Sequence, residues 1–359
     1  MGCGARRKLP ETVRAFGHRI LVVTDPGMAK EPLFQECLSL LKDGGLHVAA
    51  FTGVSPEPRV TSLQPCVDLA RDCQADVLVG IGGGSSLDVT KCVAVLLRYP
   101  REPSLLFGID KVPGRGVPTV VLPTTAGSGS EVTPIAVMSD EKRKIKLGIV
   151  SDHLIADVAL VDPELCVSLP PWPTAYTGMD AMTHAIEVYT NRFAVPFIDN
   201  LAIEAVRLVG LNLRRCVARG NDVTARYGMS LASLLGGLCL KSVNTAAVHA
   251  LAYPLGCEFN VPHGIANALL LPHVMRFNAS ACQERYKPIA EALGANDAVL
   301  AVEELSQEVG TARKLREFDV REGDLPRMAK SAMAVERLLK NNPREVTEAD
   351  ALNVYKAAW

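Results

Sequence analysis

The sequence predicts an α/β domain with a parallel sheet, followed by an all-helical domain. Up to about residue 165, short β-branched apolar runs alternate with helix-like stretches, which is typical of consecutive βαβ units. From about Leu169 onward the strand-like runs disappear, and long segments with helical periodicity follow. The cluster LPPWPT marks the change. We therefore expect an α/β domain over residues 1–168 and an all-helical domain over residues 169–359.

Composition argues against several classes of protein. The 359 residues are 48% hydrophobic and 21% charged, which is ordinary for a soluble globular protein. The formal net charge of -1 predicts neither nucleic acid nor an anionic membrane as a partner. The ten cysteines include no C-x-x-C pair, and the chain carries no signal-peptide pattern. We expect a soluble cytoplasmic protein with free thiols.

Five strands are expected in the first domain, in the runs RILVVTD, HVAAFTG, ADVLVGIG, VPTVVLPTT and VALVD. The third strand ends at about Ile81 and runs into three glycines and Ser85 before an amphipathic helix. Such a turn lets backbone N–H groups approach a pyrophosphate at a helix N-terminus. The alternative is a plain strand-to-helix turn with Ser85 as the N-cap. Neither G-x-G-x-x-G nor a P-loop is present to decide between them.

A second loop of small and hydroxyl residues, TTAGSGSEVT, follows the strand VPTVVLP. In an open α/β sheet, ligands bind beyond the carboxyl ends of the strands. Two such loops in one sheet favour a bound dinucleotide.

The helical half contains a candidate metal site. Asp180 and His184 are four residues apart in a helix-patterned segment and so share one helical face. His249 lies in a helical run that we expect Pro254 to end, and His263 precedes the expected start of another helix. One carboxylate and three imidazoles suit Fe(II) or Zn(II). A single buried histidine is more often a hydrogen-bonded core residue, and Asp180 could cap a helix; the four residues together favour a metal ion.

Four segments, GGGSSLDVTK, PTTAGSGSEVT, TGMDAMTHAIEVYT and HALAYPLGCEFNVPHGIANALLLPHVM, resemble the signature segments of the iron-containing (group III) alcohol dehydrogenases. The similarity runs from about residue 15 to the final YKAAW. It implies a Rossmann-like N-terminal domain, a helical C-terminal domain, and an active site in the cleft between them that holds NAD(P) and one metal ion. The metal ligands implied by the resemblance are Asp180, His184, His249 and His263. The implied cofactor contacts are Gly83, Gly84, Ser85, Asp88, Thr124, Thr125, Ser128 and Lys146.

The reaction implied by the resemblance is hydride transfer between the nicotinamide and the carbonyl of an aldehyde, with Fe(II) or Zn(II) as Lewis acid. Two positions differ from the family pattern. Several members have a histidine four residues after the third ligand, where this chain has Tyr253, a hydrogen-bond donor but a poor base. Thr52 stands after the second strand, where NAD-preferring relatives place an Asp that would repel a 2′-phosphate. We therefore expect NADP(H) to be accepted as well as NAD(H), with a preference for NADP(H) as an open alternative.

The substrate is expected to be a small aldehyde with an anionic group, such as phosphonoacetaldehyde or a semialdehyde. Relatives commonly have an apolar run before the third ligand, whereas this chain reads CLKSVNTAAVHA and offers Lys241, Asn244 and Thr245. A helix through His249 would place Thr245 on the same side, four residues earlier. Alternatively, Lys241 extends into solvent.

Other functions remain open at the level of sequence. A hydroxyacid-oxoacid transhydrogenase and a sugar-phosphate cyclase of the dehydroquinate synthase type share the implied architecture. A nucleotide-binding protein without catalysis is a further alternative, although it would not need an intact set of metal ligands. The segment GHRILVVTD and the helical faces leave room for a homodimer, which we expect.

Overall fold

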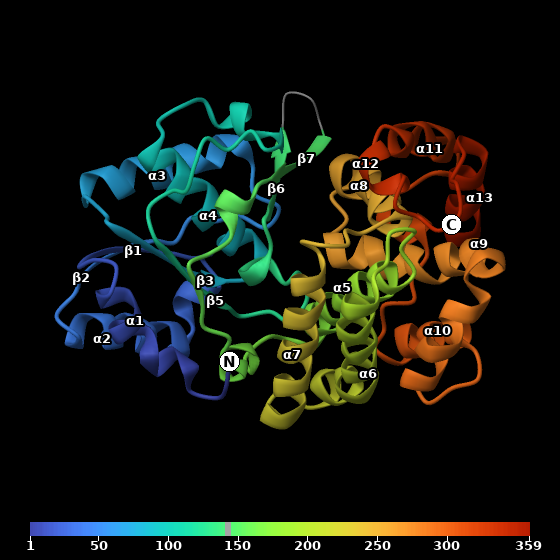
Figure 1. Cartoon of the computed structure of the whole chain (residues 1–359), viewed down its shortest axis with the longest axis horizontal. Helices are drawn as coiled ribbons and strands as arrows, with labels where there is room; N and C mark the ends of the chain where they lie inside the picture. The colour runs from blue at the N-terminus through green and yellow to red at the C-terminus, as the bar shows by residue number, and fades with distance from the viewer. Residues whose placement is uncertain (141–144) are drawn as a thin grey trace. The chain divides into compact units, whose positions relative to one another are not determined.

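The computed structural model describes residues 1–140 and 145–359, and Figure 1 labels its helices and strands. The chain divides into two compact units. The first consists of Met1–Thr125 and Gly129–Ser168, and the second of Ala126–Ser128 and Leu169–Trp359. Among the helices of the described residues, none is long and apolar enough to cross a membrane.

The first unit is built on a five-stranded parallel sheet with the strand order β2-β1-β3-β5-β8. Its strands are β1 (Arg19–Val23), β2 (His47–Phe51), β3 (Val77–Gly82), β5 (Thr119–Pro123) and β8 (Val158–Ala159). Because the chain moves from β1 outward to β2 and then back to β3, the strand order reverses at the β1/β3 pair. Ligands of such sheets bind beyond the carboxyl ends of the strands at this point.

Helices cover both faces of this sheet. They are α1 (Leu9–Arg14), α2 (Pro32–Asp43), α3 (Leu63–Asp72) and α4 (Gly84–Arg98). Successive β1 residues point to opposite faces, so Ile20 and Val22 pack with residues of α1 and α2, whereas Leu21 and Val23 pack with residues of α3 and α4. The strands are apolar on both sides for this reason, as parallel sheets require.

A smaller three-stranded sheet in the same unit was missed by the sequence prediction. It has the order β4-β7-β6 and contains β4 (Gly108–Ile109), β6 (Ile135–Asp140) and β7 (Ile145–Val150). The pair β6/β7 is antiparallel, and β4 lies parallel to β7. This sheet lies outside the alternation of strand and helix from which the larger sheet was predicted.

The described residues of the second unit form helices joined by turns and loops, without strands, and they share one extended hydrophobic core. Its helices are α5 (Pro171–Tyr189), α6 (Pro196–Ala218), α7 (Val223–Cys239), α8 (Ala247–Phe259), α9 (His263–Ala292), α10 (Ala298–Glu308), α11 (Leu325–Met333), α12 (Glu336–Leu339) and α13 (Glu348–Ala358). Helix α5 contacts α6, α7, α8 and α9 and is buried along most of its length.

Two local predictions in this unit are wrong. Helix α8 does not end at Pro254 but continues to Phe259 and stops at Asn260, which is in the left-handed conformation with φ 53°. A proline removes only one helical hydrogen bond, and the buried Pro254 is held by core packing, so the helix tolerates it. Thr245 does not lie on the helix of His249, because α8 begins at Ala247 after Ala246, whose φ and ψ of -133° are not helical.

Candidate metal centre

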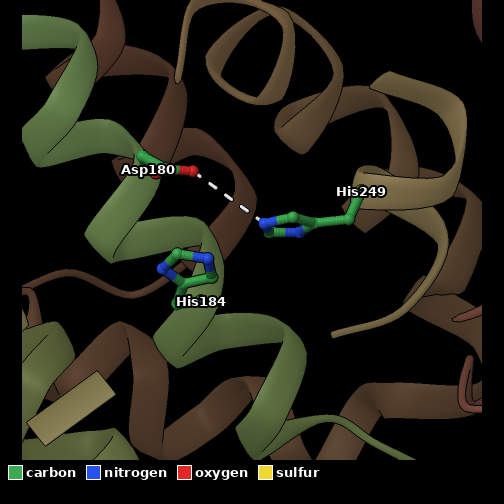
Figure 2. A group of neighbouring side chains, drawn as sticks. All are labelled: Asp180, His184 and His249. Atoms are coloured by element: carbon green, nitrogen blue, oxygen red, sulfur yellow. Dashed lines mark ion pairs between the residues drawn. The ribbon is translucent and has the colours of Figure 1, made fainter. Parts of the chain in front are cut away.

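Helix α5 carries the first two candidate ligands on one face. Asp180 and His184 stand one turn apart in the middle of the helix, and each is only 5% exposed. Asp180 is therefore too far from the start of α5 at Pro171 to be a helix cap. One ligand atom each from Asp180, His184 and His249 lies within 4.8 Å of the other two, and Figure 2 shows the three side chains converging.

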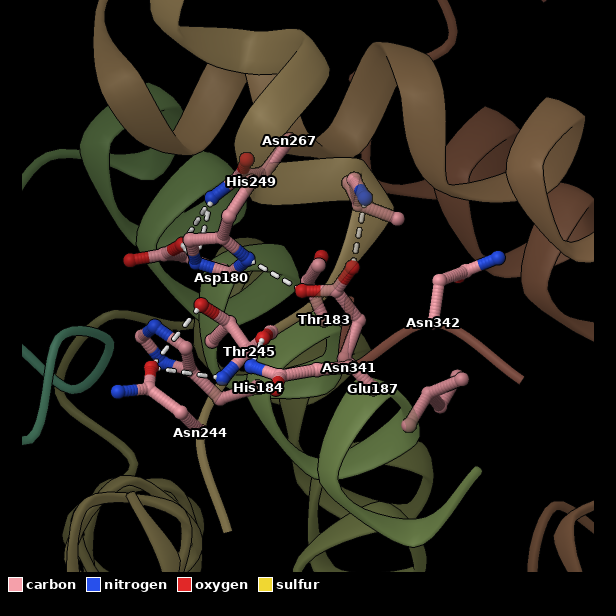
Figure 3. Close-up of polar contacts among 12 residues, drawn as sticks. Asp180, Thr183, His184, Glu187, Asn244, Thr245, His249, Asn267, Asn341 and Asn342 are labelled. Atoms are coloured by element: carbon pink, nitrogen blue, oxygen red, sulfur yellow. Dashed lines mark hydrogen bonds and ion pairs between the residues drawn. The ribbon is translucent and has the colours of Figure 1, made fainter. Parts of the chain in front are cut away.

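His249 is fixed by a carboxylate that the sequence prediction missed. Glu187, on the same face of α5 as His184, accepts a hydrogen bond from the backbone N–H of Val248 at 2.6 Å through Oε1. Its Oε2 lies 2.6 Å from Nδ1 of His249 (Figure 3). Because a carboxylate can only accept, Nδ1 of His249 carries the proton, and Nε2 keeps its lone pair for a metal ion.

His184 is oriented in a similar way by a backbone carbonyl. Its Nδ1 lies 3.2 Å from the carbonyl oxygen of Gly127, so this nitrogen is the donor and Nε2 is the acceptor. Gly127 belongs to the loop TTAGSGSEVT, and a Cβ at this position would lie 2.7 Å from the carbonyl oxygen of Thr177. Glycine is therefore needed for the close approach of this loop to α5.

His263 is the first residue of α9, and its Nε2 lies 3.9 Å from Oδ1 of Asp180. The Nε2 of His249 lies at the same distance from that oxygen. One turn along α9, Asn267 donates a hydrogen bond of 2.7 Å from Nδ2 to Oδ1 of Asp180. The sequence prediction also missed Asn267, although the spacing of four residues from His263 repeats that of Asp180 and His184.

These donors fit a divalent cation in both spacing and protonation. Tetrahedral ligands about 2.0–2.2 Å from Zn(II) stand roughly 3.4 Å apart. The separations of Asp180 from His249 and His263, 3.9 Å each, are within about 0.5 Å of that arrangement, and the group that includes His184 is wider, with its ligand atoms within 4.8 Å of one another. Burial alone would raise the pKa of Asp180, but the three nearby imidazoles and the Asn267 amide lower it. Burial lowers the pKa of His184 against the attraction of Asp180. A charged carboxylate and neutral imidazoles are the forms that bind metal.

In the first unit, the two predicted cofactor loops lie together at the carboxyl ends of β3 and β5. The backbone N–H of Thr124 donates to the carbonyl of Gly82 at 2.9 Å. A Cβ on Gly83 would lie 3.3 Å from Cγ2 of Thr125. Ser85 is not the N-cap, since α4 begins at Gly84 with Gly83 as its cap. The half-buried N-terminus of α4 is thus available to a phosphate.

Two other predicted cofactor residues have protein partners in this unit. Asp88 accepts hydrogen bonds from Ser130 Oγ at 2.5 Å and from the backbone N–H of Val137 at 2.9 Å. It also forms an ion pair with Lys91 at 3.1 Å. Lys146 forms an ion pair with Glu57.

Ser128 is half-buried on the same loop as Gly127, in the stretch that clusters with the second unit. The cofactor contacts of these residues stay predictions.

Models of two protein families match the chain. The family described as "Iron-containing alcohol dehydrogenase" matches residues 1–163, and "Fe-containing alcohol dehydrogenase family, C-terminal" matches residues 174–359. The chain belongs to the iron-containing alcohol dehydrogenase family. This confirms the resemblance seen in the sequence, together with the order of a parallel α/β domain and a helical domain.

Relatives in this family are similar over their whole length. Long-chain-alcohol dehydrogenase 1 of Geobacillus thermodenitrificans is 41% identical, over 100% of this chain and 94% of that protein. Sulfoacetaldehyde reductase of Bilophila wadsworthia is 36% identical, over 99% of this chain and 96% of that protein. The crystal structure of a 1,3-propanediol oxidoreductase has a TM-score of 0.97 at 36% identity and covers 100% of this chain and 97% of that one. This dehydrogenase is thus an NAD-linked, metal-dependent enzyme that acts on alcohols and aldehydes.

Asp25 is a third candidate functional residue of this dehydrogenase that the sequence prediction missed. It lies where the strand order of the sheet reverses. Asp25 follows β1, and its Oδ1 accepts hydrogen bonds of 2.9 Å from the backbone N–H groups of Gly27 and Met28. Its Oδ2 lies 3.6 Å from the position of a Cβ on Gly82, beside the N-terminal loop of α4. Thr52, the predicted selector of the cofactor, is exposed and follows the edge strand β2.

Proposed function

We propose that this dehydrogenase reduces a small aldehyde bearing a negative charge, with phosphonoacetaldehyde or a semialdehyde as the first candidates. The observation that carries the reductase activity is the buried set of Asp180, His184 and His249, whose ring orientations leave Nε2 lone pairs for a metal ion. We propose His263 as the fourth ligand. When bound, Fe(II) or Zn(II) would act as a Lewis acid on the carbonyl oxygen.

The protein's own contribution is to fix the ligands and to supply a proton. The hydrogen bonds of His184 and His249 hold each ring in the ligating tautomer before any ion arrives. Tyr253 lies one turn after His249 on α8, and burial raises the pKa of its phenol above the ordinary value. The phenol therefore stays protonated at neutral pH and suits the role of hydrogen-bond donor to the product oxygen.

The proposal of an anionic substrate rests on the segment that leads into α8. Lys241 is exposed in the turn after α7, three residues before Asn244. Side-chain amides fix this segment, because Asn191 donates to the carbonyl of Asn244 at 2.7 Å and Asn341 donates to that of Thr245 at 2.8 Å. A rigid polar segment with a cation at its start is suited to a charged substrate. The similar sulfoacetaldehyde reductase is named for an anionic aldehyde, which supports this proposal.

The test is a panel of aldehydes assayed with NADH after reconstitution with Fe(II) or Zn(II). Lys241→Met should raise KM for the anionic aldehyde about 10-fold or more, which corresponds to a lost charge contact of about 1.4 kcal/mol. The KM for propanal should change by no more than roughly 3-fold. Lys330→Met, which removes another exposed lysine on α11, is the matched control. Equal effects of Lys241→Met on both substrates would remove the proposal. Turnover without release of free cofactor would indicate a transhydrogenase instead.

We also propose that NAD(H) is preferred over NADP(H), because Asp25 places a carboxylate beside the N-terminal loop of α4. A carboxylate there would accept hydrogen bonds from the ribose hydroxyls of NAD and would repel a 2′-phosphate. Asp25→Asn should therefore improve kcat/KM for NADPH relative to NADH by about 10-fold, the effect of roughly 1.4 kcal/mol. Thr52→Asp is the matched comparison: if it alone shifts the cofactor preference, Thr52 and not Asp25 is the selecting position.

The homodimer expected from the sequence stays a prediction. Light scattering coupled to gel filtration of the metal-loaded enzyme would test it by giving the mass in solution.

A further inference from the structure

Asn267 contacts three of the four candidate metal ligands. It is completely buried on α9. Its Nδ2 lies near three of the four ligand atoms, at 2.7 Å from Asp180 Oδ1, 3.1 Å from His249 Nε2 and 3.2 Å from His263 Nε2. Figure 3 shows the amide beside Asp180 and His249.

The oxygen of the Asn267 amide, Oδ1, is buried and has no hydrogen-bond partner among the residues that the structure describes. A buried polar atom without a partner costs about 1–3 kcal/mol. An apolar residue of similar size would avoid this cost but would deprive the buried carboxylate of Asp180 of its 2.7 Å hydrogen bond, so the reason for an asparagine at this position lies with Asp180.

Asn278, eleven residues later on the same helix, shows what a structural asparagine looks like here. It exchanges two hydrogen bonds with Asn342, one of 2.9 Å from its own amide nitrogen and one of 2.8 Å to its oxygen. Both polar atoms of its amide are satisfied, and neither partner is a metal ligand. Asn267 differs on both points: among the described residues its oxygen has no partner, and the partners of its nitrogen are the candidate ligands Asp180, His249 and His263.

We propose that Asn267 is a positioning residue of the metal centre. Its N–H group donates to Oδ1 of Asp180 and thereby fixes the rotation of the carboxylate about the end of its side chain. The remaining lone pairs of Asp180 are then directed to the same point as the imidazole nitrogens of His249 and His263. Two helices each contribute a pair spaced by one turn: Asp180 and His184 from α5, and His263 and Asn267 from α9.

The inference rests on the metal site and not on the identity of the substrate. It is tested by titrating Co(II) or Zn(II) into the metal-free protein in competition with a chromophoric chelator. Because no aldehyde is present, its failure is distinguishable from failure of the proposed substrate. The visible absorption of the Co(II) form provides a second readout, since its bands report the geometry of the ligands and not the stability of the fold.

Asn267→Ala should weaken metal binding by about 10–100-fold, the usual effect of losing a group that orients a ligand. Asn278→Ala, the matched control, should bind within roughly 3-fold of the wild type despite a lower unfolding temperature. Asn267→Asp keeps the size of the side chain and covers the case in which the alanine variant does not fold. Its carboxylate beside Asp180 should change both the metal affinity and the Co(II) spectrum. The proposal is overturned if a folded Asn267→Ala variant binds the metal ion as tightly as the wild type. It is also overturned if Asn267→Asp has the metal affinity and the Co(II) spectrum of the wild type.

Discussion

Glu187→Gln is the sharpest test of how the metal centre is held. The wild-type carboxylate accepts two hydrogen bonds of 2.6 Å, from the backbone N–H of Val248 and from Nδ1 of His249. A glutamine of the same size has one oxygen and can accept only one of them. If that oxygen faces Val248, the amide NH2 faces His249 and favours the tautomer with its proton on Nε2, which cannot bind a metal ion.

The magnitude follows from the bond that is lost. A hydrogen bond to a charged group contributes about 1.5–3 kcal/mol, which corresponds to roughly 10–100-fold in affinity. Losing a group that orients a metal ligand has an effect of the same size, typically about 10–100-fold. We therefore expect Glu187→Gln to weaken Co(II) or Zn(II) binding by this factor. At a free metal concentration about 100 times the wild-type Kd, the metal stabilises the fold by about 2.7 kcal/mol, and the variant loses about 1.3 kcal/mol of this for 10-fold weaker binding or about 2.3 kcal/mol for 100-fold weaker binding.

The assay is the chelator competition together with thermal unfolding in EDTA and in excess metal. Glu204→Gln is the matched control, because Glu204 is an exposed partner of Arg207 on α6 and such surface pairs contribute about 0–1 kcal/mol. The control should leave the difference in unfolding temperature between metal and EDTA unchanged. If Glu187→Gln binds metal as tightly as the wild type, the carboxylate does not set the tautomer of His249, and the reasoning is refuted.

Three further outcomes are expected. Gly127→Ala should weaken metal binding about 10-fold, because its Cβ would lie 2.7 Å from the carbonyl oxygen of Thr177 and would displace the Gly127 carbonyl that pairs with His184. Gly323→Ala is the control: beyond its neighbours in the chain, no heavy atom of the described residues lies within 4 Å of its Cβ, and metal binding should not change. Burial raises the pKa of Glu131 to about 7 from an ordinary 4.5, so the folded state favours its neutral form, and stability is lost as pH rises through 7. The free energy of unfolding of Glu131→Gln should therefore exceed that of the wild type at pH 8, by at most about 3 kcal/mol, but not at pH 4. A gain that is independent of pH would contradict this. EDTA should abolish aldehyde-dependent oxidation of NADH and excess Fe(II) or Zn(II) should restore it; activity that persists in a preparation verified as metal-free would be inconsistent with the site.

The parts of the fold that were predictable from sequence are those with strong local periodicity. The runs around β1, β3 and β5 are apolar on both faces, and long amphipathic segments such as α6 show the helical period over many residues. The end of α8 was not predictable, because one proline weakens a helix locally while core packing decides whether the helix continues. The start of α8 was also predicted wrongly: Thr245 was placed on this helix, which begins two residues later at Ala247.

The metal ligands were visible in the sequence because their chemistry is out of place in apolar helices. Asp180 and His184 share a helical face by spacing alone, whichever elements surround them. Glu187 was equally visible as a third polar residue on that face, three positions after His184, but its role depends on the start of α8. Asn267 could not be interpreted before the structure, since an asparagine is informative only once its partners are known.

Helix α5 explains why a site of this kind is stiff enough to bind a metal ion. Its polar face presents Asp180, His184 and Glu187, and every residue from Gly178 to Tyr189 is buried. A Cβ on Gly178 would lie 2.2 Å from Cδ1 of Leu213 on α6, so the two helices approach at the limit that glycine allows. The ligands therefore cannot move apart without moving a helix that contacts α6, α7, α8 and α9. Metal affinity and the packing of this unit are coupled for that reason, and a cation that binds only the folded form stabilises the core that aligns its ligands.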